Sequence, residues 1–176
     1  LGTILESGLH ASVVSFAVGL TLLTVSGLAI TRIREGMIRF LRALGSGEMP
    51  WWWAMGGIFG ALFIFSQSFT VGIIGVALFA VALVSGQNSA SLIVDAVGLG
   101  PRGKQPIGTV RVISAAIGIV AVIVAVSGRL GQDDLSLPAV ALCFVTGIGV
   151  AIQQAINGRS TTISREPMVA AWSNFA

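Results

Sequence analysis

The stretch Ile73–Val97 has the sequence IIGVALFAVALVSGQNSASLIVDAV, in which Asp95 is the only charged residue. A helix rises about 1.5 Å per residue, so this stretch is long enough to cross the ~30 Å hydrocarbon core of a bilayer. Comparable apolar stretches lie at 11–31, 51–69, 109–127 and 137–156. The sequence therefore predicts an all-α polytopic transmembrane helix bundle with five full spans, followed by the start of a sixth at the C-terminal end.

The composition supports a membrane protein and excludes several other classes. Charged residues make up 10% of the chain and fall almost entirely between the apolar stretches. The 23 glycines among 176 residues suit closely packed membrane helices. A single cysteine, Cys143, provides neither a disulfide framework nor a cysteine metal site, and we expect it to serve in packing. The basic residues flank predicted spans, so they indicate orientation and not a nucleic-acid partner.

The distribution of arginine and lysine predicts the topology. Basic residues gather in the connection between the first two spans, Arg32–Arg42, and again at 102–104 and 159–165. By the positive-inside rule these connections are cytoplasmic, which leaves residues 1–10 periplasmic. The segment Arg32–Leu44 is itself predicted to be a short interfacial helix, whose apolar side comprises Ile33, Met37, Phe40 and Leu41.

Three local patterns predict details of the bundle. The uncharged segment Thr70–Gly72 is expected to connect the second and third spans. Gly72 and Gly75 flank this connection and could serve as a hinge, but a tight turn is the favoured interpretation. Trp51–Trp53 after Pro50 is expected to form an aromatic belt at the membrane interface, not a cation cage. The small residues of Gly56-xxx-Gly60 indicate a face on which helices cross closely.

A weak internal repeat links the two ends of the chain. When Phe16 is placed on Phe175, residues 1–17 and 160–176 share Thr3/Thr162, Ile4/Ile163, Ala11/Ala170 and Ala17/Ala176 as well. The offset of about 159 residues spans five membrane crossings, an odd number, so the second copy would be inverted. We expect 1–135 to be most of a first five-helix repeat and 136–176 to begin the second.

Several segments in order along the chain carry a family resemblance. They are Ala11–Gly19 (ASVVSFAVG), Trp52–Gly57 (WWAMGG), Gly86–Ser91 (GQNSAS) with Asp95, and Gln153–Arg159 (QQAINGR). Together they resemble the YdcZ-like family of the drug/metabolite transporter superfamily. The resemblance implies a bacterial inner-membrane transporter of ten helices in two inverted five-helix halves (5+5). We expect this chain to be a piece that lacks the first helix and most of the second half.

Polar residues within the predicted spans form stripes. In the third span Gln87, Ser91 and Asp95 recur every four residues, with Asn88 beside them. The fifth span carries Gln153 and Asn157 at the same spacing, and Gln67 lies near the end of the second. Such amides either hold helices together by hydrogen bonds worth ~0.6 to 2 kcal/mol each or line a solute pathway. The candidates for a substrate pathway are Gln67, Gln87, Asn88, Ser91, Gln153 and Asn157.

Asp95 is the only carboxylate within a predicted span, and intramembrane acids often mark function. It lies near the cytoplasmic end of its span. It could therefore couple transport to an ion, or form an interfacial ion pair with Arg102, Lys104 or Arg111.

No set of nucleophile, base and orienting acid can be assembled from the polar residues, and no metal-ligand cluster is visible. We therefore predict no catalytic residues, no metal and no cofactor. The sequence favours a secondary transporter that moves a small polar or amphiphilic metabolite by alternating access. The alternative is a non-transporting membrane scaffold or accessory subunit. The expected partners are the lipid bilayer, a small-molecule solute, and either a homo-oligomer or the missing half.

Overall fold

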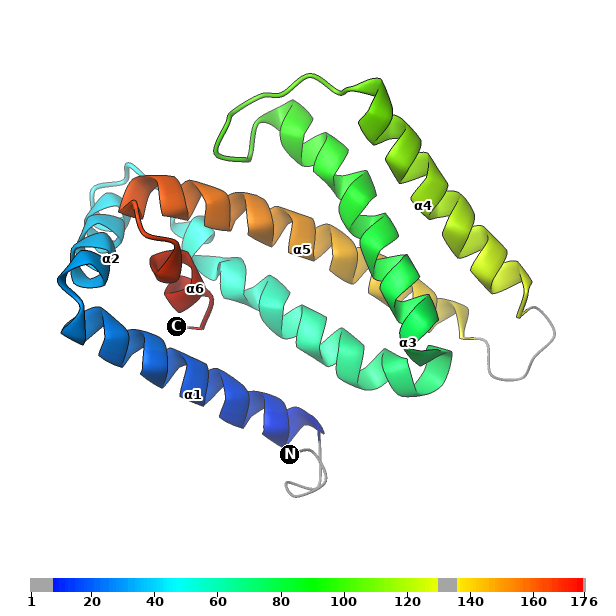
Figure 1. Cartoon of the computed structure of the whole chain (residues 1–176), viewed down its shortest axis with the longest axis horizontal. Coiled ribbons are helices and arrows are strands. Elements are labelled where there is room, and N and C mark those ends of the chain that lie inside the picture. The colour runs from blue at the N-terminus through cyan, green and yellow to red at the C-terminus, as the bar shows by residue number, and fades with distance from the viewer. Residues whose placement is uncertain (1–7, 130–135, 176) are drawn as a thin grey trace. The chain divides into compact units, whose positions relative to one another are not determined.

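The computed structural model describes residues 8–129 and 136–175, and within this part of the chain every regular element is helical. The elements are α1 (Gly8–Ala29), α2 (Thr31–Gly45), a 3-10 turn η1 (Trp51–Met55), α3 (Gly56–Val97), α4 (Thr109–Ser127), α5 (Leu137–Ser164) and α6 (Pro167–Phe175) (Figure 1). The all-α prediction is confirmed for the described residues.

Three helical segments are long and apolar enough to cross a membrane: Trp51–Val97, Thr109–Ser127 and Leu137–Ser164. The bent pair Val13–Ala29 and Thr31–Gly45 provides a fourth candidate. The predicted span 109–127 coincides with α4, whereas α5 continues eight residues beyond the predicted end at 156. The protein is thus a helical membrane protein, and its described residues contain three to four candidate spans.

The chain reverses at Gly75, inside α3, and not at the predicted turn Thr70–Gly72. Gly75 has φ 79° and ψ 159°, a conformation open only to glycine. Phe63 and Phe79 have ring centroids 6.1 Å apart, whereas a straight helix would separate them by about 24 Å. α3 is therefore a helical hairpin, and residues 70–72 belong to its first arm.

An arginine from another helix end supports this reversal. The Arg129 guanidinium donates a hydrogen bond of 2.7 Å to the backbone carbonyl of Ile74, directly before the turn. A carbonyl at a helix break lacks its helical donor, and a buried one costs free energy unless another donor replaces it. Arg129 thus completes the hydrogen bonding of the hairpin.

The described chain forms two compact units, which we describe separately. The second unit comprises Ala61–Ile152. Its hydrophobic core joins both arms of α3 to the beginning of α5 through Ile74, Leu78, Phe79, Ala82, Leu83, Ala139, Val140 and Cys143. Cys143 is fully buried there, and its thiol donates to the Thr70 hydroxyl at 3.2 Å.

Two glycines allow α3 and α5 to cross with their backbones in contact. A β-carbon on Gly86 would collide with the Phe144 carbonyl, and one on Gly147 would collide with that of Leu83. The two collisions are reciprocal, so the crossing depends on small residues from both helices. The adjacent α4 is different, because most of its apolar side chains are exposed, although Val122, Ala125 and Val126 pack against the core and Ala115 is buried.

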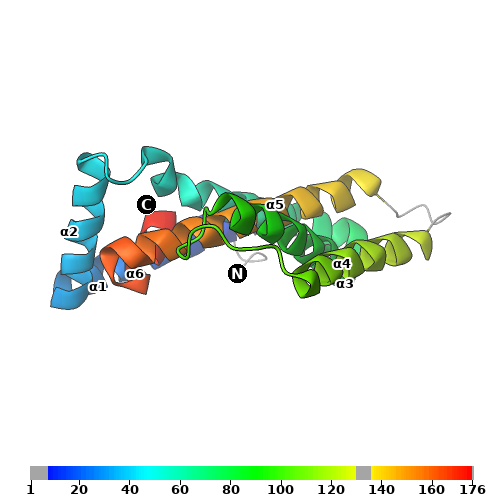
Figure 2. The same cartoon turned by 90° about the horizontal axis from the view of Figure 1, so that it is seen from above.

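The first unit comprises the described residues up to Gly60 together with those from Gln153 onward. Within it, α1 and α2 meet at Ile30, whose backbone is extended, and their axes differ by 106°. Arginines begin at Arg32, and a charged side chain is costly in the hydrocarbon core. The chain therefore bends where the charged residues begin, and α2 runs across the direction of α1 (Figure 2).

α6 packs against α1, α2 and η1 and holds this unit together. The rings of Phe16 and Phe175, paired in the sequence repeat, stack edge to face with centroids 4.9 Å apart. The Trp172 indole donates to the Thr24 hydroxyl at 3.2 Å. The end of the chain is thus docked on α1.

α2 is helical as predicted, but its buried face differs from the expected one. Ile33 and Phe40 are buried together with Gly36 and Ala43, whereas Leu41 is exposed. The apolar side predicted from spacing is therefore divided, because part of α2 packs against the corner between α5 and α6 instead of against lipid.

Candidate functional site

α5 brings two predicted pathway amides to one face within the first unit. Gln153 and Asn157 are four residues apart, so they lie on the same side of the helix. A β-carbon on Gly60 would lie 3.1 Å from Gln153 Nε2, and one on Gly56 would lie 3.7 Å from Asn157 Oδ1. The predicted small-residue face of α3 therefore receives the amides of α5.

A third amide, Asn174 of α6, reaches the same glycines. Its Oδ1 would lie 2.8 Å from a β-carbon on Gly56, and its backbone would collide with one on Gly57. We call Gln153, Asn157 and Asn174, gathered around these glycines, the amide cluster. Glycine is required at position 57 because the backbone of α6 occupies the space that any side chain would need.

Some polar side-chain atoms are buried without a hydrogen-bond partner among the described residues, and two of them belong to amides of the cluster. They are Trp53 Nε1, Asn157 Oδ1, Ser160 Oγ and Asn174 Oδ1. All four belong to the first unit, and they come from η1, α5 and α6. An unpaired buried polar group costs about 1 to 3 kcal/mol, and folded proteins contain few of them. Four such atoms in one unit, two of them on amides of the cluster, therefore make this unit the candidate site for a hydrogen-bonding molecule.

The tryptophan segment is divided between surface and interior. Trp51 and Trp52 are exposed, as an interfacial belt requires, but Trp53 is buried. The Arg159 guanidinium lies 5.4 Å from the centroid of the Trp53 ring. Trp53 therefore departs from the predicted interfacial belt, because its ring is buried against Arg159 of α5; this single cation over one ring is not an aromatic cage.

The other predicted pathway residues lie in the second unit, on α3. Gln67 is exposed, while Gln87, Asn88 and Ser91 are half-buried. The Ser91 hydroxyl donates to the Asn88 carbonyl, so its hydrogen bond stays within the helix. The structure thus places Gln153 and Asn157 together, and Gln87, Asn88 and Ser91 together, in separate units.

Ser85 holds two helices of the second unit together. Its hydroxyl lies 2.7 Å from the Gly118 carbonyl of α4 and 2.7 Å from the Val81 carbonyl one turn earlier in α3. Ser85 is 1% exposed. Ser85 therefore joins α3 to α4 by a hydrogen bond, which is one of the two roles considered above for the amides.

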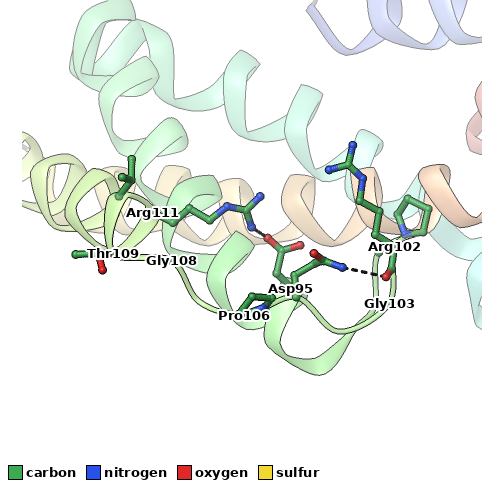
Figure 3. A pocket seen from close by; sticks show the side chains of 11 residues that line it. Asp95, Arg102, Gly103, Pro106, Gly108, Thr109 and Arg111 are labelled. Atoms are coloured by element: carbon green, nitrogen blue, oxygen red, sulfur yellow. Dashed lines mark hydrogen bonds and ion pairs between the residues drawn. The ribbon is translucent and has the colours of Figure 1, made fainter.

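Asp95 forms an ion pair with Arg111 at the start of α4 (Figure 3). In the same view the Arg102 side chain points away from Asp95. Asp95 and Arg111 both line an open pocket of about 720 Å³, which is formed with the loop between α3 and α4. Two roles were considered for Asp95, coupling to an ion and an interfacial ion pair, and its contact with Arg111 is an ion pair.

The glycine loop around this pair is built on a helix end. Gly98, with φ 76°, ends α3, and its N–H and that of Leu99 donate to the carbonyls of Asp95 and Val94. This is a Schellman cap, which satisfies carbonyls that the helix leaves open. The Gln105 N–H also donates to the backbone carbonyl of Asp95, so the loop folds back onto the end of α3.

The sequence analysis missed Asn174, Ser160 and Ser85 as site or packing residues. Asn174 is the only amide in the final apolar run, and the Gly56-Gly57 pair signals a close approach. Neither pattern says which segment approaches the glycines, so the pairing could not be found from the sequence.

Within residues 8–129 and 136–175, no group of three or more histidine, cysteine, aspartate or glutamate side chains could hold a metal ion. The fold and the buried amides together define a helical membrane protein with a polar region inside its helix packing. The chain belongs to the family described as "Putative inner membrane exporter, YdcZ", whose model matches residues 1–124. The protein is therefore a member of an inner-membrane transporter family and not of an enzyme family. No match was found among curated proteins or among solved structures.

Proposed function

We propose that the protein is a secondary transporter that moves a small polar or amphiphilic solute by alternating access, and that the amide cluster contributes to its binding site. The observation that carries this proposal is the pair of amide oxygens, on Asn157 and Asn174, buried beside Gly56 without a hydrogen-bond partner in the described part of the chain. Membership in an inner-membrane exporter family supports it.

The chemistry of the cluster favours a solute with hydrogen-bond donors. Amide oxygens accept hydrogen bonds, the Ser160 hydroxyl both donates and accepts, and the Trp53 indole N–H donates. We therefore favour a small polar solute that carries both hydrogen-bond donors and acceptors.

The location also suits a transporter. The amides lie where α3, α5 and α6 approach through glycines, and a site between packed helices can open when the helices shift. Secondary transporters bind their substrates between helices of this kind. Because these glycines have no side chains to interlock, small displacements there would break few contacts.

The proposed architecture is a five-plus-five inverted repeat. The two arms of α3, counted separately, together with α1, α4 and α5, would make the five predicted spans, and α6 would start a sixth. The family match ends at residue 124, within α4. We propose that 136–176 begins the second, inverted repeat, and that a homo-oligomer or the remaining half completes the bundle.

We propose that Arg32–Arg42 faces the cytoplasm and that residues 1–10 face the periplasm; residues 1–7 lie outside the described part of the chain. In a Cys143→Ser background, single cysteines at Ser46 and Gln132 should differ in labelling by an impermeant maleimide on intact cells. Labelling at position 132 alone supports this orientation, and labelling at position 46 alone contradicts it.

Transport is tested in sealed vesicles that contain the complete protein. A panel of labelled sugars, amides and amino alcohols should include a solute with saturable flux, and empty vesicles give the background. A scaffold or accessory subunit would show no saturable flux for any solute. The Asn157→Leu and Asn174→Leu variants then test whether the amide cluster takes part.

A further inference from the structure

The four arginines of α2 are divided between two faces. Arg32 forms an ion pair of 2.7 Å with Glu166, which is buried. Arg39 donates from both Nε and Nη2 to the Ser164 carbonyl, at 3.0 and 2.8 Å. These two arginines join α2 to the corner between α5 and α6, so their charges already have partners within the protein.

Arg34 and Arg42 have neither an ion pair nor a side-chain hydrogen bond among the described residues, and both are exposed. They share a helix face with Ile38, which is 47% exposed, and Leu41, which is 51% exposed. Glu35, the acidic residue of α2, lies toward Arg39, with 3.7 Å between Oε2 and Nη1. We call Arg34, Ile38, Leu41 and Arg42 the outer face of α2.

The outer face has the chemistry and the placement of a membrane-surface helix. α2 turns by 106° from α1, so if α1 crosses the bilayer, α2 lies close to the membrane plane. Interfacial helices of this kind bury apolar side chains at the boundary between headgroups and acyl chains and extend basic ones toward phosphates. Trp51 and Trp52, both exposed, follow α2 after a short connection and suit the same level.

We propose that the outer face of α2 binds anionic phospholipid, with the guanidinium groups of Arg34 and Arg42 on lipid phosphates and Ile38 and Leu41 against the acyl chains. Charge complementarity favours this occupant, because two arginines without partners among the described residues flank two exposed aliphatic side chains on one helix face. A guanidinium group binds phosphate through two parallel hydrogen bonds, which favours arginine at such a site. The proposal rests on α1 spanning the membrane and is independent of transport.

The test is lipid retention by the complete protein, measured by native mass spectrometry after purification from mixed phosphatidylglycerol and phosphatidylcholine. The parent protein should retain phosphatidylglycerol in preference to phosphatidylcholine. Each arginine near an anionic surface contributes about a fivefold effect, so Arg34→Gln with Arg42→Gln should lower that preference by roughly 30-fold. The matched control is Arg102→Gln with Lys104→Gln, which removes two charges from the loop after α3 and should lower the preference by a clearly smaller factor, because these charges lie in a loop and not on an amphipathic helix face.

Three further results decide the proposal. Arg34→Lys with Arg42→Lys should keep much of the preference for phosphatidylglycerol. This result would show that the positive charge is needed and that substitution at these two positions does not by itself misfold the protein. Equal loss in the control variant would show a general charge effect and overturn the proposal. Displacement of the lipid by glycerol phosphate at equal concentration would show a site for free phosphate and would also overturn it.

Discussion

Asn157 in α5 and Asn174 in α6 turn their side-chain oxygens toward the same glycine, Gly56, and neither oxygen accepts a hydrogen bond from the described protein. Their arrangement is the opposite of that of Ser85, whose buried hydroxyl has two carbonyl acceptors in reach. A polar group retained for helix packing should have its partner in the protein, whereas a group retained for a solute should not. This contrast is the basis of the functional proposal.

The first prediction concerns the hairpin in α3. Gly75→Ala should lower the free energy of unfolding by about 1 to 3 kcal/mol, because alanine is strained at the φ and ψ of this residue. The matched control is Gly72→Ala, since Gly72 is helical with open space around it and alanine favours helices. Thermal unfolding in detergent compares the two. Greater damage from Gly72→Ala would place the reversal at the predicted turn 70–72.

A second prediction concerns the docking of α6. Gly57→Ala should destabilise the first unit by about 1 to 3 kcal/mol, because the new methyl group meets the Asn174 backbone, which cannot rotate away. Proteolysis near residue 166 should become faster as α6 detaches. Gly45→Ala provides the control, since nothing lies within 4 Å of the added carbon. Unchanged protection at residue 166 in Gly57→Ala would contradict the close approach.

The third prediction concerns Arg39. Arg39→Gln should cost about 1.5 to 3 kcal/mol in unfolding free energy, because two charged hydrogen bonds to the Ser164 carbonyl are lost. Arg34→Gln removes the same charge from the exposed face of α2 and should change stability by less than about 0.5 kcal/mol. If the two variants unfold alike in detergent, Arg39 does not hold α2 to the corner between α5 and α6.

Local patterns were sufficient to predict most of the helices. The apolar run 109–127 became α4 with the same bounds, and the amphipathic spacing of 32–44 became α2. In each case the signal lies within one segment, where periodicity and charge spacing act directly. The position of the reversal in α3 was not predictable in this way. Gly72 and Gly75 are equivalent in composition, and only the packing of the two arms selects Gly75.

The candidate site was predictable only in part. Gln153 and Asn157 were identified because their spacing places them on one helix face. Asn174 is 17 residues farther along, on a helix whose docking depends on contacts with α1 and η1. Likewise, Arg111 was one of three possible partners for Asp95, and the fold of the loop between α3 and α4 selected it. Such pairings depend on tertiary structure, which the sequence pattern does not contain.

The central claim is tested most directly by comparing Asn157→Leu with Ser85→Ala in sealed vesicles, with flux measured per folded protein. Because Asn157 Oδ1 has no hydrogen-bond partner among the described residues, Asn157→Leu should not lower stability, but it should lower flux roughly 5-fold to 100-fold through a lost bond to the solute. Ser85→Ala should instead lose ~0.6 to 2 kcal/mol of stability and keep its flux per folded protein. Parental flux in Asn157→Leu, or a loss of flux that merely follows a loss of folded protein, would contradict the assignment of the amide cluster as a solute site.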